Sequence, residues 1–125
     1  MKRRAARRRS IPVRTGRLES FANPAPERDY EIEHVAPEFT SVCPVTGQPD
    51  FSTVEIDYEP ATRCIESKSL KLYLWGFRDQ PIFAEGLAAA IAAEVQDAAA
   101  PRRVTVVVTQ HVRGGIVTEA TAELP

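Results

Sequence analysis

The hydrophobic periodicity of this chain changes from two residues to about four and back to two, which limits the folds open to it. Apolar residues alternate with polar ones over residues 54–58 and predict a strand with one buried face. A shorter alternation over residues 30–34 predicts an earlier strand, and we expect Pro37 to end it. The segment between them, residues 40–50, is rich in turn-forming residues and is expected to be a loop.

Two helices are expected after these strands. From Ser67 onward, apolar residues recur at i, i+3, i+4 and i+7 across residues 70–77, a pattern typical of an amphipathic helix. Apolar residues four positions apart among many alanines predict a second helix over residues 87–95. Alternation then returns on both sides of Gly114 and Gly115, which predicts two more strands joined by a turn. The order ββααββ is typical of an α+β fold, with both helices on one face of an antiparallel sheet.

Charge divides the chain into two parts. The net charge of the 125 residues is −1, yet residues 1–20 hold eight basic residues and one acid, against eight basic and sixteen acidic residues in 21–125. We therefore expect residues 1–20 to be a basic, disordered arm and residues 21–125 to form a single domain. Such an arm could also contact the phosphate backbone of a nucleic acid, although no aromatic residue is interleaved to stack on bases.

Several familiar functional signatures are missing from the sequence. There is no apolar run of about 18 residues for a membrane span and no apolar segment after the arginines for a secretory signal, so a cytoplasmic protein is expected. Two cysteines are too few for a secreted disulfide framework. Glycine-rich dinucleotide and phosphate loops are absent, and the cysteines and histidines lack zinc-like spacing, so no metal site is expected.

Cys43 and Asp50 are the first candidates for chemistry. They lie at either end of a short segment that contains two prolines and a glycine, so a turn could fold them together. A cysteine attacks as its thiolate, and a desolvated aspartate can donate a proton to an intermediate. The alternative for Cys43 is an inert buried thiol. Cys64 is expected to serve packing, and whether the two cysteines ever pair is left open.

A second group of candidates lies at the start of the first predicted helix. Glu66 and Ser67 stand where acids and hydroxyls cap free backbone amides, which is an adequate structural role for both. Lys68 and Lys71 are neighbours on one helix face, which is either solvated surface or an anion-binding face. Arg113 precedes two glycines, where a hairpin turn alone would explain it.

Two segments carry a resemblance to a known family. Residues 39–51 read Phe-Thr-Ser-Val-Cys-Pro-Val-Thr-Gly-Gln-Pro-Asp-Phe, and residues 66–73 read Glu-Ser-Lys-Ser-Leu-Lys-Leu-Tyr. Both are similar to the signature segments of the short 7-cyano-7-deazaguanine reductases, the NADPH-dependent nitrile reductases of queuosine biosynthesis. The resemblance covers about residues 30–120. It implies the tunnelling fold that this family shares with GTP cyclohydrolase I.

The resemblance also implies a role for each matching position. Cys43 would attack the nitrile carbon and form a covalent thioimide, and Asp50 would deliver a proton to the nitrile nitrogen. Hydrides from NADPH would then reduce the nitrile to an aminomethyl group. The other implied contacts are with the substrate, at Ile65, Glu66, Ser67, Ala84 and Glu85, and with the phosphates of the cofactor, at Lys68, Lys71 and Arg113.

In this family, subunits join their sheets into a ring, so the resemblance implies a homo-oligomer, either a pentamer or a decamer of two stacked pentamers. One departure concerns the family's histidines, which are replaced here by Gln80 and Ala84. Alanine neither forms side-chain hydrogen bonds nor carries a proton, so reduction is expected to be slower or altered while capture by Cys43 survives. Two alternatives remain, namely an amidinotransferase that uses ammonia and the same thioimide on a tRNA-borne nitrile, and a non-reducing deazapurine-binding protein.

Overall fold

The computed structural model describes residues 17–125, and its main feature is a four-stranded antiparallel sheet. Most of the expected basic arm, residues 1–16, lies outside this range. The strands pair in the order β2-β3-β5-β6, and β2–β3 and β5–β6 are hairpins. Their bounds are Ile32–Val42 for β2, Pro49–Glu59 for β3, Arg103–Arg113 for β5 and Ile116–Leu124 for β6.

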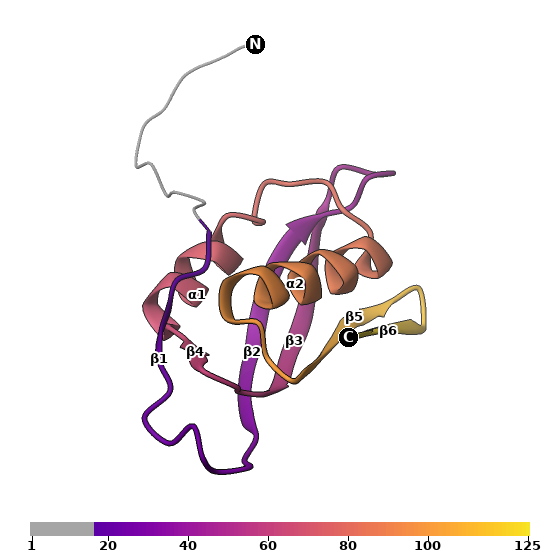
Figure 1. Ribbon diagram of the computed structural model, residues 1–125. Helices are drawn as coiled ribbons and strands as arrows, with labels where there is room; N and C mark the ends of the chain where they lie inside the picture. The colour runs from indigo at the N-terminus through magenta and orange to yellow at the C-terminus, as the bar shows by residue number, and fades with distance from the viewer. Residues whose placement is uncertain (1–16) are drawn as a thin grey trace, which may run out of the picture.

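Both helices cover the same face of this sheet (Figure 1). Helix α1 (Ser67–Trp75) packs beside β2, and helix α2 (Ala84–Ala99) lies across β5 and β6. The apolar positions of α2 at Leu87, Ile91 and Val95 are almost completely buried against alternate residues of β3 and β5. The predicted α+β fold, with its ββααββ order and its helices on one face, is confirmed.

A second, two-stranded sheet was missed by the sequence analysis. Strand β1 (Ser20–Ala22) pairs with β4 (Arg63–Ile65), and both are too short to show a hydrophobic period. Just before β1, Leu18 is buried in the core, and its amide donates to Glu94 Oε2 at 2.9 Å. Leu18, which lies in the segment expected to be the arm, therefore contributes to the core.

The expectation that Pro37 ends its strand was wrong. Strand β2 continues to Val42, and its register against β3 shifts between Ala36 and Phe39. An irregularity on an edge strand accommodates a proline because no ladder hydrogen bond is required of it there. The predicted loop over residues 40–50 consequently shrinks to a short turn between Val42 and Pro49.

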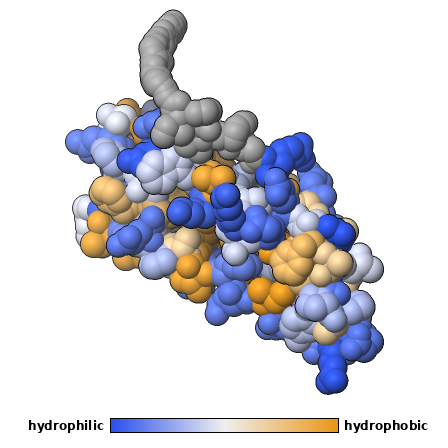
Figure 2. Space-filling view, turned by 90° about the vertical axis from the view of Figure 1, so that its left-hand side faces the viewer, coloured by the Kyte–Doolittle hydropathy of each residue, from blue (hydrophilic) through white to orange (hydrophobic). Residues whose placement is uncertain are grey.

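The surface carries several exposed apolar side chains. Figure 2 shows them as separate orange areas among hydrophilic groups on the α1 side of the molecule. Others lie near the β5–β6 turn, where Val112, Ile116 and Val117 are each more than half exposed. Within residues 17–125, neither helix has the length and apolar character that crossing a membrane requires.

Candidate functional site

The turn between β2 and β3 carries Cys43. The Cys43 amide donates to the Gln48 carbonyl at 2.8 Å, and the Gly47 amide donates back to the Cys43 carbonyl at 2.9 Å. Gly47 has a φ of +75°, a left-handed conformation that glycine adopts without steric cost. These bonds fix the backbone on either side of Cys43 and leave its side chain half-buried at the tip of the hairpin.

The environment of this thiol favours its ionised form. The pKa of Cys43 is lowered to about 7, chiefly by a hydrogen bond from the Thr46 hydroxyl and then by the amides of Thr46 and Val45. Partial burial opposes this effect, and the Arg113 side chain adds a smaller contribution that favours the thiolate. Cys64 is buried on β4, and both cysteines are free. Cys43 is therefore the more accessible of the two thiols, and its surroundings stabilise the thiolate.

Asp50 lies beside this turn, as the spacing of the two residues predicted. It stands opposite Ser41 in the β2–β3 ladder and is only 3% exposed. Its Oδ1 accepts a hydrogen bond from Nη1 of Arg113, with which it forms an ion pair. The structure thus brings the predicted nucleophile and acid together, and it adds to them a cation that was expected among the cofactor ligands.

A third segment passes along the same turn. The Val42 amide donates to the Gln80 carbonyl at 3.2 Å, and the Ile82 amide donates to the Val42 carbonyl at 3.1 Å, so residues 80–82 pair with the end of β2. This pairing places the start of α2 beside the turn. A shallow hollow there is lined by Pro44, Pro81, Ile82, Phe83, Glu85 and Gly86.

The two predicted substrate residues on α2 differ in exposure. Glu85 is exposed and faces the hollow that Pro44 also lines, so its carboxylate can reach a ligand near the turn. Ala84 is 7% exposed and belongs to the hydrophobic core. The position at which the resemblance implies a histidine is therefore filled by a buried methyl group, which carries no proton.

The other predicted site residues gather at the start of α1. Glu66 caps this helix, and its carboxylate accepts from the amides of Ser69 at 2.7 Å and Lys68 at 2.9 Å. These two backbone bonds lower the pKa of Glu66. Ile65 is buried, and its amide donates to the Tyr58 hydroxyl at 2.8 Å. The capping role inferred from sequence for Glu66 is confirmed.

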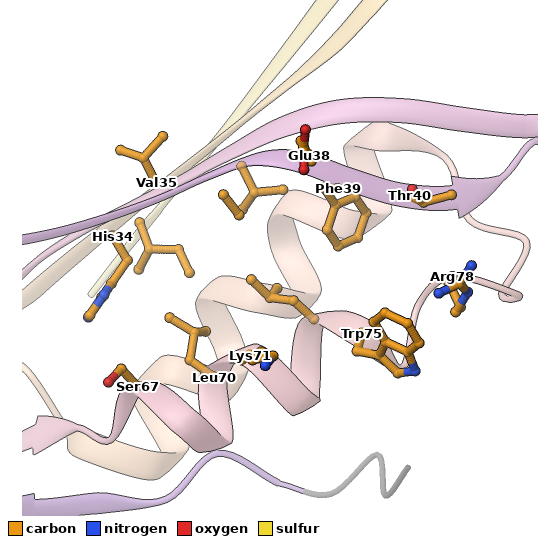
Figure 3. A pocket seen from close by; sticks show the side chains of 14 residues that line it. His34, Val35, Glu38, Phe39, Thr40, Ser67, Leu70, Lys71, Trp75 and Arg78 are labelled. Carbon is orange, nitrogen blue, oxygen red and sulfur yellow. The ribbon is translucent and has the colours of Figure 1, made fainter. Parts of the chain in front are cut away.

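A groove runs between α1 and β2 and has a volume of about 410 Å³ (Figure 3). Ser67 and Lys71 line it from α1, and His34 lines it from β2. At its far end, the Arg78 guanidinium stacks on the Trp75 ring, 4.2 Å from the ring centroid. The floor is apolar and is made by Phe39, Val54, Ile56, Leu70 and Leu74.

Sequence reasoning missed the contribution of His34, Trp75 and Arg78 to this groove. His34 was expected to be an ordinary strand residue. The alternation of apolar and polar residues around it does not show whether its side of the strand faces a groove or solvent. Trp75 carries no distinguishing signal in the sequence, and only the structure shows that its side chain is 49% exposed beside the groove.

The two groups of site residues lie apart within one chain. The tip of the β2–β3 hairpin and the start of α1 are well separated in Figure 1. Among residues 17–125, no hydrogen bond or ion pair joins the Cys43, Asp50 and Arg113 group to Glu66 or Lys68. The predicted site residues therefore form two separate groups within one chain.

Comparison with known proteins places this geometry in a family. The family model described as QueF-like protein matches residues 49–124, a segment that begins just after the Cys43 turn. A protein of Anaeromyxobacter sp. (strain Fw109-5) is 53% identical over 113 residues, which cover 90% of this chain and 93% of that one, and is named NADPH-dependent 7-cyano-7-deazaguanine reductase. The chain belongs to the QueF-like family, which the family model describes.

Two further comparisons agree with this membership. A relative from Alkalilimnicola ehrlichii with the same name is 51% identical over 106 residues, which cover 85% of this chain and 82% of that one. The crystal structure of an archaeosine synthase described as QueF-Like, in its apo form, superposes with a TM-score of 0.67 at 25% identity. That match covers 76% of this chain and 91% of the solved one, and it confirms the expected tunnelling fold.

The acidic thiol generates a first prediction. The alkylation rate of Cys43 by iodoacetamide should rise with pH along a titration curve centred near pH 7, because only the thiolate reacts and the folded pKa is about 7. The rate should be close to its plateau by about pH 8. The measurement is the alkylation rate of a Cys64→Ser variant, in which Cys43 is the remaining thiol.

Thr46→Val supplies the matched comparison. It removes the hydroxyl that contributes most to the lowered pKa of Cys43 and keeps a β-branched side chain on the turn, so its titration midpoint should move upward. A profile that still rises above pH 9 in the protein with Thr46 intact would contradict the assignment of Cys43 as an activated thiol.

Proposed function

We propose that this protein is an NADPH-dependent nitrile reductase that converts 7-cyano-7-deazaguanine to 7-aminomethyl-7-deazaguanine, a reaction of tRNA queuosine biosynthesis. The observation that carries this proposal is the juxtaposition of an acidic thiol, Cys43, with a buried carboxylate, Asp50, at the tip of one hairpin. The relatives that bear the name of this reductase are about half identical to the chain and cover most of it. We place the reaction in the cytoplasm, which rests on the sequence alone.

Cys43 captures the nitrile in the proposed mechanism. Its sulfur adds to the electrophilic nitrile carbon, so that the S–H bond breaks while a C–S bond and an N–H bond form, which gives a thioimide. Asp50 is paired with the Arg113 guanidinium, and in the proposed mechanism it acts from its carboxylate form, which accepts a proton but cannot donate one. It therefore first accepts the thiol proton and then passes it to the nitrile nitrogen, with no proton gained or lost overall.

Two carboxylates are proposed to recognise the base. Glu85 faces the hollow beside the Cys43 turn, and a carboxylate there can accept from the N–H groups of a guanine-like edge. Glu66, with Ile65 and Ser67 on either side, contributes from the start of α1 in a second copy of the chain. Glu66 uses its two helix-capping bonds to fix its own position, and its remaining lone pairs are free to accept from a ligand.

The start of α1 also fits the phosphate groups of NADPH. Lys68 and Lys71 are exposed, lie on one side of the helix, and form no ion pair with any residue of 17–125. Lysine ammonium groups in this state are available to an anion. When bound, NADPH supplies the hydrides, and two equivalents are needed to take a nitrile to a primary amine.

We further propose that copies of the chain assemble through their sheet edges into a pentamer or a decamer. Strand β6 is an outer strand of the sheet, and none of residues 17–125 pairs with its free edge. Among the described residues, only 80–82 pair with the free edge of β2, and they do so at Val42. Open edges of this length are paired or protected in stable proteins, and joining them in a ring would close the sheet.

A second candidate function is favoured by Ala84. The position has no group that could carry a proton, and the similar solved structure is named archaeosine synthase rather than reductase. Under this alternative, the same thioimide on Cys43 is attacked by ammonia and an amidine is formed on a tRNA-borne nitrile. The two candidates share the capture step and differ in the species that then attacks the thioimide, a hydride or ammonia.

The central prediction of the proposed function concerns turnover. Purified protein mixed with 7-cyano-7-deazaguanine should oxidise two equivalents of NADPH per substrate, measured as the loss of NADPH absorbance. Cys43→Ala should abolish this, because no thioimide can form without the thiol. Cys64→Ala, which removes the buried thiol on β4, is the matched control and should retain the activity.

The outcome also separates the two candidates. An absence of NADPH oxidation by folded protein, together with amidine formation from ammonia and a nitrile-bearing tRNA, would replace the reductase by the transferase. An absence of both reactions would defeat both proposals.

The assembly generates its own prediction. Sedimentation velocity at micromolar concentration should show a homo-oligomer of the 13.8 kDa chain, with a mass that corresponds to five or ten copies. Val117→Lys, which adds a charge beside the open edge of β6, should shift the distribution toward smaller species. Ala89→Lys, on the exposed side of α2, should leave it unchanged, and a monomer for the protein with both residues intact would contradict the ring.

A further inference from the structure

We infer that Arg113 is a positioning residue that holds Asp50 against the Cys43 turn, and that it does not bind the cofactor phosphates. The inference rests on the proposed function for the chemistry it serves, but its geometry stands on the contacts of the chain itself. Arg113 touches the acid of the site directly, whereas the two exposed lysines lie on α1, apart from it.

The local backbone explains how Arg113 reaches Asp50. Strand β5 shifts its register against β6 between Gln110 and Arg113, which is the irregularity of a β-bulge. Bulges change the direction of the side chains that follow them and are common beside active sites. Gly114 and Gly115 then close the turn with φ values of +57° and +80°, which glycine tolerates. The end of β5 is thereby shaped to present Arg113 to the start of β3.

The burial of Asp50 explains why a partner is required. A carboxylate that is 3% exposed has lost most of its water, and a buried charge without a partner is strongly destabilising. Arg113 is the one cation of residues 17–125 that pairs with it. The Arg113 side chain is 39% exposed, so it can neutralise the carboxylate while keeping part of its own hydration.

The position of the guanidinium also affects the charge balance around Cys43. A thiolate and a carboxylate at one hairpin tip are two negative charges, and each disfavours the other. Arg113 touches Asp50 and is among the groups that favour the Cys43 thiolate, so it serves both anions. Removing the Arg113 side chain should leave the negative charge of Asp50 uncompensated beside the thiol. Removing the Asp50 charge while keeping Arg113 should leave an unpaired positive charge there.

This charge balance predicts opposite effects from two single variants. In a Cys64→Ser background, Arg113→Ala should lower the alkylation rate of Cys43 at pH 7 by at least about threefold, because an unpaired anion disfavours the thiolate. Asp50→Asn should raise that rate at pH 6, because the guanidinium is then unopposed. The double variant should return to within about twofold of the parent, and Arg113→Lys should lie between the parent and Arg113→Ala.

A second readout tests the cofactor side. Lys71→Ala should raise the KM for NADPH by about tenfold through the loss of a charged contact, whereas Arg113→Ala should leave this KM within about twofold and lower kcat instead. An unchanged alkylation profile together with a raised NADPH KM in Arg113→Ala would overturn the inference and make Arg113 a phosphate ligand. The alkylation measurements need neither substrate nor cofactor, so their result stands whether or not the proposed reaction is correct.

Discussion

The structure depends on the close packing of helix α2 against the central strands of the sheet. Leu87, Ile91 and Val95 are almost fully buried there, and each such side chain stabilises the fold by about 1.5–3 kcal/mol relative to an exposed one. The alanines between them let the helix approach the sheet closely. This packing fixes β5 beside β3, and the pairing of β5 with β3 in turn brings the β5–β6 turn to the Cys43 hairpin.

The site that results is organised around a buried charge. The buried Asp50 side chain is paired with Arg113, which follows the register shift of β5 just before the β5–β6 turn. The Cys43 turn supplies its own donors, from Thr46 and Val45, so the acidity of the thiol originates locally while its neighbour is held from a distant strand. The proposed nucleophile and the proposed proton carrier are thus positioned by two separate parts of the chain.

Much of the fold could be predicted from the sequence. Residues 54–58 and 87–95 each bury one face, and apolar residues recur along that face at the spacing of a strand or a helix. Strands β1 and β4 could not, since three residues carry no period. Cys43 and Asp50 were predicted to lie together from the short turn between them, and the β2–β3 register places Asp50 opposite Ser41, two residues before Cys43. The partner of Asp50 was not foreseen, because the two residues of that ion pair are 63 positions apart and only the folded sheet joins them.

Capture of the nitrile at Cys43 is tested most directly by mass spectrometry of the intact protein after incubation with 7-cyano-7-deazaguanine in the absence of NADPH. The addition places the whole nitrile on the sulfur with no leaving group, so the protein should gain the full mass of the substrate at Cys43 alone. The adduct should disappear when NADPH is added, with release of the amine. No added mass on folded protein, or an adduct at Cys64 instead, would contradict the assignment of the β2–β3 turn as the site of capture.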